Sequence, residues 1–211
     1  MTVLPGKFIT FEGGEGLGKT TNLPFIQDYL QRRNIKVVST REPGGTPLAE
    51  KIRQLLLNTE GENLSEHTEL LLMFAARSQH ITHVIKPALA QGHWVLCDRF
   101  TDASYAYQGG GRGINTDTIA WLEQCVQGEL RPHLTLLFDA PVEVGMTRAA
   151  QRGGKADRFE AEKLNFFEQV RQAYLTRAQQ DAKRIKIIDA QQSLLAVQQA
   201  LITIIDELLP T

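Results

Sequence analysis

Residues 13–20 have the types and the spacing of a phosphate-binding loop. They read Gly-Gly-Glu-Gly-Leu-Gly-Lys-Thr, which fits the pattern G-x-x-x-x-G-K-T. In such a loop the glycines let successive backbone N–H groups point at an anion, the lysine reaches the β- and γ-phosphates, and the hydroxyl holds Mg²⁺. We therefore predict that Lys19 and Thr20 serve a nucleoside triphosphate bound at the start of the next helix.

The sequence on both sides of this loop agrees with that interpretation. An apolar strand pattern, Phe8-Ile9-Thr10-Phe11, precedes it, and Leu23, Phe25, Ile26 and Leu30 give the following segment a helical pattern. A glycine-rich turn can match the loop pattern by chance, but a chance match does not require a strand before it and a helix after it. The context therefore favours nucleotide binding.

Asp98 stands where an acidic partner for the loop is expected. It follows Trp94-Val95-Leu96-Cys97, a continuous apolar run typical of a strand buried on both faces. Open α/β sheets bind ligands at the carboxyl ends of their strands, and a strand-end acid of this kind holds Mg²⁺ directly or through water. Strand-end aspartates also cap helices and turns. Beside a phosphate loop, we predict that Asp98 is a magnesium ligand.

Positive charge gathers between residues 148 and 158. Arg148, Arg152, Lys155 and Arg158 surround the pair Gly153-Gly154. Cations at a solvated helix end would suit the helix dipole. Alternatively, the glycines make the segment a lid that closes over the phosphates and brings an arginine to the charge on the transferred group. The phosphate loop elsewhere in the chain favours the lid.

Five apolar or β-branched runs alternate with helical patterns along the chain. They are residues 8–11, 36–40, 94–97, 134–138 and 185–188. Strands that alternate with helices are typical of a parallel sheet covered by helices. We predict an α/β fold with a five-stranded parallel sheet and helices on both faces, in a single domain spanning residues 1–211. The glycine-rich residues 109–113 are expected to form a flexible loop.

Residues 65–90 form the longest predicted helix, which Ser65 caps. Its middle, residues 70–76, is apolar all the way round. A helix that flanks a sheet normally keeps one wet face, so a second surface should cover this one. We hypothesise a homodimer through this helix; burial within the monomer is the alternative.

Two pairs of side chains lie three residues apart on the same helix. Phe74 and Arg77 could stack on and hydrogen-bond a base, although a core phenylalanine beside a surface arginine is the usual case. For His80 and His83 we predict surface positions, because no carboxylate or cysteine stands at metal-site spacing.

The bulk composition excludes several kinds of partner. The chain has 211 residues and a formal net charge of -1, so it lacks the basic field that attracts nucleic acid. The longest apolar run is far shorter than the ~18 residues of a membrane span, and no secretory signal is present. Cys97 and Cys125 lie in apolar segments and are expected to be buried, reduced thiols. We expect a cytoplasmic protein with no nucleic-acid or membrane partner.

Six motifs together resemble those of the thymidylate kinase family and cover nearly the whole chain. They are Phe11-Glu12-Gly13-x-Glu15-Gly16-x-Gly18-Lys19-Thr20, Arg41-Glu42-Pro43-Gly44-Gly45-Thr46, Phe74-Ala75-Ala76-Arg77, Asp98-Arg99-Phe100, Ala106-Tyr107-Gln108-Gly109 and the arginine-rich lid. The resemblance implies a P-loop kinase fold with a small lid at about residues 148–158. It also implies transfer of the γ-phosphoryl group of ATP to the 5′-phosphate of dTMP, with Mg²⁺, giving dTDP and ADP.

The resemblance implies roles for individual residues on the acceptor side. Phe74 would stack on thymine while Arg77 hydrogen-bonds its edge, and Tyr107 would fill the space of a ribose 2′-hydroxyl. Ser104 and Gln108 would line the base side. Arg41 and Arg99 would hold the dTMP phosphate, and Glu15 would accept a hydrogen bond from the 3′-hydroxyl. The implied dTMP-binding set is Glu15, Arg41, Phe74, Arg77, Arg99, Ser104, Tyr107 and Gln108.

On the donor side, the family places ATP on the phosphate loop and adenine near Arg148. The implied ATP-binding set is Gly13, Gly14, Glu15, Gly16, Leu17, Gly18, Lys19, Thr20, Thr21 and Arg148. The catalytic set is Lys19, Arg99 and Arg152, and the metal set is Thr20 and Asp98. Family members carry a catalytic arginine either in the loop or in the lid; Gly16 together with Arg152 resembles the bacterial type with a lid arginine. Leu17 and Phe100 depart from the usual family residues.

Two rival functions remain. One is a P-loop kinase for another nucleoside monophosphate or a small hydroxyl acceptor. The other is a nucleotide-dependent switch or partitioning protein; against it, the chain has no Asn-Lys-x-Asp motif and no lysine early in the phosphate loop.

Overall fold

A five-stranded parallel sheet forms the centre of the computed structural model, which describes residues 6–58, 63–151, 158–159 and 162–209. The strands are β1 (Phe8–Gly13), β2 (Val37–Arg41), β3 (Trp94–Asp98), β4 (Leu134–Asp139) and β5 (Ile185–Asp189). Their order is β2-β3-β1-β4-β5, and every neighbouring pair is parallel. The predicted fold class and strand number are confirmed.

The three central strands are buried on both faces, as their apolar runs predict. Every residue of β1 is buried, and β3 and β4 are buried except for their last residues, Asp98 and Asp139. The edge strands β2 and β5 are partly exposed. The two strand-end aspartates therefore lie at the carboxyl edge, beside the end of β1 at Gly13.

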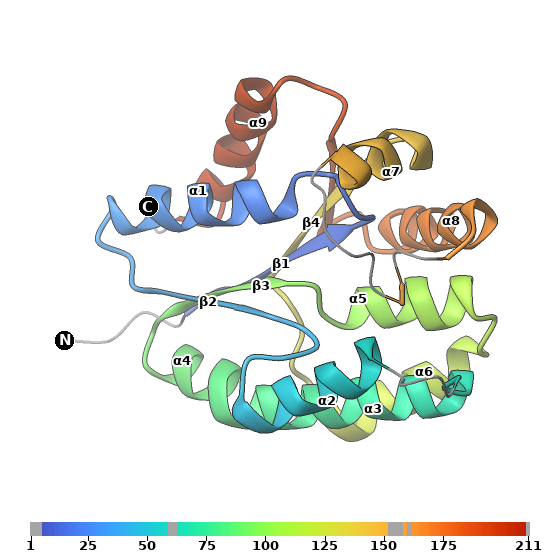
Figure 1. Ribbon diagram of the computed structural model, residues 1–211. Helices are drawn as coiled ribbons and strands as arrows, with labels where there is room; N and C mark the ends of the chain where they lie inside the picture. The colour runs from blue at the N-terminus through green and yellow to red at the C-terminus, as the bar shows by residue number, and fades with distance from the viewer. Residues whose placement is uncertain (1–5, 59–62, 152–157, 160–161, 210–211) are drawn as a thin grey trace.

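Helices cover both faces of the sheet (Figure 1). The regular helices are α1 (Lys19–Gln31), α2 (Pro47–Leu57), α3 (Glu66–His80), α4 (Lys86–Ala90), α5 (Thr101–Ser104), α6 (Thr116–Gln127), α7 (Val142–Gln151), α8 (Leu164–Gln180) and α9 (Leu194–Asp206). Two π-helical segments, η1 (Ile81–Ile85) and η2 (Tyr105–Gly111), continue α3 and α5. Figure 1 shows α1 and α9 on one face and α3 to α6 on the other.

The core follows the alternation of side chains along β1. Ile9 and Phe11 pack with α1 and α9 residues, whereas Phe8 packs with Ile81, Ile85 and the β3 side chains on the opposite face. A third cluster joins α8 to η2 and to Leu137 of β4. The sheet is thus fixed from both sides, and its carboxyl edge is held in a constant position.

The predicted helix 65–90 is present, with Ser65 as its cap and η1 interrupting its regular part. Its apolar middle is incompletely covered by the described chain, because Leu71 is 58% exposed and Ala75 is exposed. Trp121 of the neighbouring α6 is 67% exposed. This pair of helices therefore presents an apolar surface to solvent.

The predicted flexible loop at residues 109–113 is wrong for its first part. Residues 109–111 belong to η2, which packs against α8. A Cβ on Gly110 would lie 2.6 Å from the Ala173 side chain, and one on Gly111 would lie 2.4 Å from the Phe166 ring. These glycines permit close helix packing rather than mobility.

The prediction for the cysteines is half correct. Both thiols are free, and Cys97 is buried in β3, but Cys125 is exposed. Cys125 lies four residues after Trp121, so both project from the outward side of α6. Separately, none of the helices in the described ranges is long and apolar enough to span a membrane.

Candidate active site

The phosphate loop connects the end of β1 to the start of α1. Gly13, Gly16 and Gly18 have φ values of 126°, 72° and 93°, a region that residues with a Cβ rarely adopt. Gly16 also lies against α7, because a Cβ there would be 2.1 Å from the carbonyl oxygen of Gly145. Glycine is therefore required at this position for both its backbone angle and its contact.

Lys19 is the first residue of α1, and its side chain folds back over the phosphate loop. Its Nζ donates to the carbonyl oxygens of Gly13 at 3.0 Å and Gly14 at 2.6 Å, and the side chain is buried. Burial and the nearby positive charge of Arg99 lower its pKa to about 8, against the opposing effect of Glu15 and Asp98. A phosphate bound here would favour the charged form of the lysine.

Asp98 ends β3 beside the loop, paired in register with Phe11 of β1. Its Oδ1 is buried and has no hydrogen-bond partner among the described residues. Thr20 is exposed in the first turn of α1. The described residues contain no group of three or more His, Cys, Asp or Glu that could enclose a metal. An open site with one carboxylate and one hydroxyl suits Mg²⁺, which keeps waters and substrate phosphates as ligands.

Arg99 has a left-handed backbone, with φ of 66°. Its guanidinium donates to the carbonyl oxygen of Gly13 at 2.9 Å and to Tyr107 Oη at 3.2 Å, and it forms an ion pair with Glu15. The Arg99 N–H donates to the carbonyl oxygen of Phe11 at 3.0 Å. The side chain is thereby directed toward the phosphate loop, which repays the cost of this backbone conformation.

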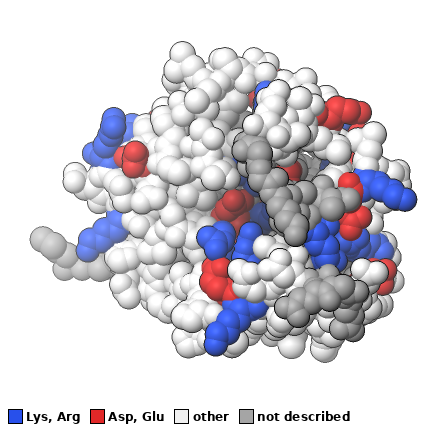
Figure 2. All heavy atoms as spheres, in the orientation of Figure 1, with Lys and Arg blue, Asp and Glu red and all other residues white. Residues whose placement is uncertain are grey.

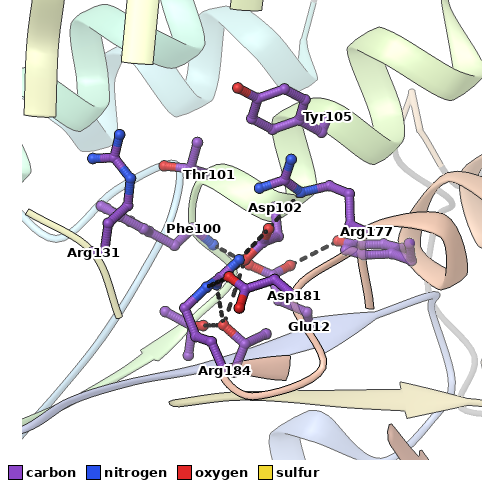
Figure 3. Close-up of polar contacts among 12 residues, drawn as sticks. Glu12, Phe100, Thr101, Asp102, Tyr105, Arg131, Arg177, Asp181 and Arg184 are labelled. Carbon is purple, nitrogen blue, oxygen red and sulfur yellow. Dashed lines mark hydrogen bonds and ion pairs between the residues drawn. The ribbon is translucent and has the colours of Figure 1, made fainter. Parts of the chain in front are cut away.

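Two carboxylates, Glu12 and Asp102, are buried close to this turn, and Glu12 contacts it directly (Figure 3). Glu12 accepts hydrogen bonds from the N–H of Phe100 and from Tyr174 Oη, both at 2.7 Å. Burial, together with the negative charge of Asp102, raises the pKa of Glu12 to about 8. Asp102 is itself buried, but hydrogen bonds from Arg184 at 2.7 Å and Arg177 at 2.6 Å lower its pKa.

A cavity opens beside Arg99, between α2, α3 and the α5–η2 helix, and we call it the arginine-lined cavity. Its empty volume is about 640 Å³, open solvent included. It is lined by Glu15, Glu42, Pro43, Arg53, Leu57, Met73, Arg77, Arg99, Phe100, Ala103, Ser104, Tyr107, Gln108 and Phe159. Figure 2 shows positive and negative side chains intermixed around the middle of this side of the molecule.

Arg77 is held on one wall of this cavity by buried partners. Its Nε donates to Glu42 Oε2 at 2.7 Å, and its Nη2 donates to the carbonyl oxygen of Phe100 at 3.1 Å. Its Nη1 is buried and has no partner within the described residues. The arrangement leaves a charged donor available to a ligand.

Comparisons with known proteins identify the family. A sequence model described as thymidylate kinase matches residues 11–201. The thymidylate kinase of Pseudomonas entomophila is 61% identical over 207 residues, which cover 98% of this chain and 96% of that protein. The chain belongs to the thymidylate kinase family. The thymidylate kinase of Pseudomonas syringae pv. tomato is 57% identical over 206 residues, 98% of either chain.

A solved structure agrees with this family. The crystal structure of thymidylate kinase from Ehrlichia chaffeensis has 33% sequence identity and a TM-score of 0.78, covering 96% of this chain and 99% of that one. Thymidylate kinases are enzymes that phosphorylate dTMP to dTDP with ATP as the donor. The predicted family, enzyme class and reaction are therefore confirmed.

The structure brings six of the eight predicted dTMP-binding residues to one cavity. They are Glu15, Arg77, Arg99, Ser104, Tyr107 and Gln108. Arg41 lies outside the cavity, with a side chain that is 53% exposed and paired to Glu50 at 2.8 Å. Phe74 packs in the core with Leu70, Ile114 and Ile119. The guanidinium carbon of Arg77 lies 4.6 Å from its ring centroid.

The predicted lid is described only at its two ends. Arg148, in the last turn of α7, donates to the carbonyl oxygen of Ala190 at 2.8 Å. Arg158 donates to Glu69 and to the carbonyl oxygen of Leu56. Arg152 and Lys155 lie outside the described residues.

The structure adds residues that the sequence did not reveal, and it corrects one prediction. His80 was expected at the surface, yet it is fully buried: its Nδ1 lies 2.9 Å from Glu42 Oε1 and its Nε2 lies 2.7 Å from Thr40 Oγ1. Its partners come from the end of β2 and the loop after it, so no local pattern announces them. His83 is exposed as predicted. Glu42 belongs to the family motif at residues 41–46, and this was the one indication in the sequence of its role beside Arg77.

A second cavity lies between the phosphate loop, β4, α7 and α8. It is mostly apolar, with Leu17, Phe138, Met146 and Phe167 among its lining residues. The Leu17 that departs from the family pattern packs here, buried beneath the loop. On its wall, Arg171 donates to both oxygens of Asp139 at 2.7 and 2.9 Å.

Proposed function

We propose that dTMP occupies the arginine-lined cavity and that the triphosphate of ATP occupies the phosphate loop, so that the reacting phosphates meet at Arg99. One observation supports this most directly: Glu15 and Arg99 pair with each other where the loop and the cavity adjoin. Both anions would then lie within reach of one guanidinium. Phosphoryl transfer needs chiefly positioning and charge neutralisation, which this arrangement supplies.

On the base side, Arg77 would use its Nη1, which has no partner among the described residues, at the edge of thymine, with Ser104 and Gln108 beside it. Phe74 would stack on the base, which requires it to gain access from its present core position. Tyr107 would exclude a ribose 2′-hydroxyl. Its ring is buried and contacts Phe159, Phe166 and Tyr174 edge-on, so it is poorly placed to move aside.

On the phosphate side, Arg99 and Arg41 would hold the dTMP phosphate in the fork geometry of the guanidinium. Arg41 would first leave its exposed pairing with Glu50, at little cost. Glu15 would accept a hydrogen bond from the 3′-hydroxyl of dTMP. The acceptor phosphate therefore gains one arginine that is already oriented and one that arrives.

On the donor side, Lys19 and the loop N–H groups would bind the β- and γ-phosphates, and the ATP-binding set would extend from Gly13 to Thr21, with Arg148 near adenine. Thr20 and Asp98 would hold Mg²⁺, which when bound neutralises charge on the donor phosphates. The Oδ1 of Asp98, which is buried and without a hydrogen-bond partner in the described part of the chain, supports this assignment.

The catalytic arginine would be Arg152 in a lid at about residues 148–158, within a single domain of residues 1–211. Support comes from α7, whose backbone contacts the phosphate loop at Gly145. Helix α7 ends at Gln151, six residues or about 9 Å of helix after Gly145, so the described chain stops close to the loop just before Arg152. This distance is compatible with an arginine that reaches the transferred phosphoryl group.

We further propose a homodimer in which a second copy covers the exposed apolar surface of α3 and α6. Leu71, Ala75, Trp121 and Cys125 would lie in the interface. An exposed thiol also suits the reducing cytoplasm. Light scattering at micromolar concentration should give twice the chain mass; a monomer mass would contradict the dimer.

An acceptor panel tests the proposed function. ADP formation from ATP should be fastest with dTMP when compared with dUMP, dCMP, dGMP, dAMP and UMP. Turnover of UMP equal to that of dTMP would contradict the role of Tyr107. Slow ATP hydrolysis that no acceptor stimulates would instead favour the nucleotide-dependent switch.

A further inference from the structure

Glu69 is a buried carboxylate that does not line the arginine-lined cavity but contacts residues that do. It lies in the first turn of α3 and is 1% exposed. Its Oε1 accepts from Gln108 Nε2 at 2.7 Å, and its Oε2 accepts from Arg158 Nη2 at 2.6 Å. Arg112 Nη2 lies 3.3 Å from Oε2. A carboxylate this deeply buried is retained only with such partners.

The first consequence concerns the amide of Gln108, which lines the cavity. An ionised carboxylate only accepts hydrogen bonds, so it fixes the amide with its NH₂ group toward Glu69. The amide oxygen is then left to accept a hydrogen bond from a ligand. Thymine offers an N–H donor at N3, whereas cytosine has an acceptor at that atom.

The second consequence concerns the segment that follows residues 152–157. Besides its bond to Glu69, Arg158 donates through Nε to the carbonyl oxygen of Leu56 at 3.0 Å, in the last turn of α2. Its guanidinium lies 4.5 Å from the centroid of Phe159, whose ring contacts Tyr107 edge-on at 6.1 Å. Phe159 lines the cavity. Docking of Arg158 on Glu69 therefore holds one wall of the cavity in position.

We propose that Glu69 is a positioning residue for the acceptor: one carboxylate both sets the orientation of the Gln108 amide and holds the Arg158–Phe159 wall. The inference rests on the proposed placement of dTMP in this cavity. It assigns base discrimination partly to a residue that never touches the base, because the amide is symmetric in shape and only its partner tells its two ends apart.

The substitution Glu69→Gln tests this directly, because glutamine has the same shape but can donate as well as accept. The Gln108 amide can then turn over, so we expect the ratio of kcat/KM for dTMP to that for dCMP to fall about tenfold, the value of one misplaced hydrogen bond. KM for dTMP should rise by a similar factor, with KM for ATP changed less than twofold. The matched control is Glu66→Gln, an exposed glutamate in the same turn, which should change neither.

A merely structural role would lower thermal stability and leave the dTMP to dCMP ratio unchanged, and that result would overturn the proposal. A rise in KM for ATP as large as that for dTMP would overturn it as well. If Glu69→Gln does not fold, Arg158→Lys decides the matter, since Arg158 is partly exposed and lysine cannot bridge Glu69 and Leu56 together. An increase in KM for dTMP alone supports the proposal, and an unchanged KM contradicts it.

The acceptor panel separates this failure from that of the proposed function. If wild type prefers dTMP while Glu69→Gln keeps that selectivity, or Arg158→Lys keeps the wild-type KM for dTMP, only the role of Glu69 is wrong. If wild type shows no preference for dTMP, the placement of the acceptor is wrong.

Discussion

The arginine-lined cavity and the phosphate loop differ in how each holds positive charge. In the cavity, Arg77 and Arg99 are already paired with Glu42 and Glu15, and these carboxylates fix the directions of the guanidinium groups. In the loop, Lys19 donates to carbonyl oxygens of the loop itself and to no other group among the described residues. One region is organised before its ligand arrives, and the other awaits the charge that the ligand brings.

The choice of cation explains this difference. A guanidinium remains protonated when buried, so the charge of the cavity is constant. An ammonium group loses its proton readily when buried, and the pKa of Lys19 is lowered to about 8. On the proposed placement of the two substrates, dTMP would meet guanidinium groups that are already oriented, and ATP would meet a lysine whose charge depends on binding.

The largest expected effect comes from removing the charge of Arg152, which belongs to neither the arginine-lined cavity nor the phosphate loop. We expect Arg152→Ala to lower kcat by about 10³-fold or more with little change in either KM, because the contact should form mainly in the transition state. Steady-state kinetics with varied ATP and varied dTMP measure it. A raised KM with an unchanged kcat would make Arg152 a binding residue. The comparison of cavity and loop would then have to include Arg152 as a further cation that contacts the bound substrates.

The next effect tests whether the carboxylates do direct the arginines. Glu42→Gln keeps Arg77 but weakens the hydrogen bond that orients it, at a cost of about 2 kcal/mol, or roughly a 30-fold rise in KM for dTMP. KM for ATP should stay constant. The control is His83→Gln, at an exposed residue of η1, which continues the helix that carries Arg77. Equal losses for both substrates would mean that Glu42 serves general stability instead.

A smaller effect separates lysine from arginine by pH. Below pH 8 the buried Lys19 is charged, and above pH 8 the folded, unliganded protein loses this proton while the unfolded chain still keeps it. The contribution of Lys19 to the free energy of unfolding therefore rises with pH between about 8 and 10.5. ATP restores the charged form. Calorimetry at pH 8 in two buffers of different ionisation enthalpy should detect uptake of a fraction of a proton on ATP binding, and almost none at pH 6.5.

In the variant Lys19→Arg, the pH 8 uptake should vanish even if binding is weaker, since arginine holds its proton. Binding of dTMP to the wild type should take up no proton at this residue. Proton uptake that persists in Lys19→Arg would assign the titration to another group.

The smallest effect is expected at Arg41, whose ion pair, unlike that of Arg77, lies at the surface. Its side chain is 53% exposed and pairs with the partly exposed Glu50. Arg41→Ala should raise KM for dTMP a few-fold, about 1 kcal/mol or less, which is typical of an exposed charge. Titration of dTMP into Arg41→Ala and into Glu42→Gln measures the difference in dTMP affinity between the two variants. An effect at Arg41 larger than at Glu42 would reverse the comparison.

The sequence predicted those features that depend on neighbouring residues. The apolar runs gave the five strands, and the spacing from Gly13 to Thr20 gave the loop between β1 and α1. Asp98 was placed at the carboxyl edge because it directly follows the apolar residues 94–97 of its strand. Local periodicity and spacing are sufficient for elements of this kind.

Features that depend on distant partners could not be read in this way. His80 is buried because Glu42 and Thr40 meet it from another element, and Glu69 is buried because Gln108 of η2 and Arg158 supply its donors. The glycines at 110 and 111 look like a flexible loop until α8 is placed beside them. Single-sequence patterns record the residue types here but not the contacts.

The contact between Gly16 and Gly145 limits which side chains the phosphate loop of this chain can carry. A side chain at Gly16 would meet the Gly145 carbonyl, and one at Gly145 would lie 2.5 Å from the carbonyl oxygen of Glu15. An arginine introduced into this loop would thus displace α7 before it could act. Engineering an arginine into this loop would therefore require a change in the position of α7 as well.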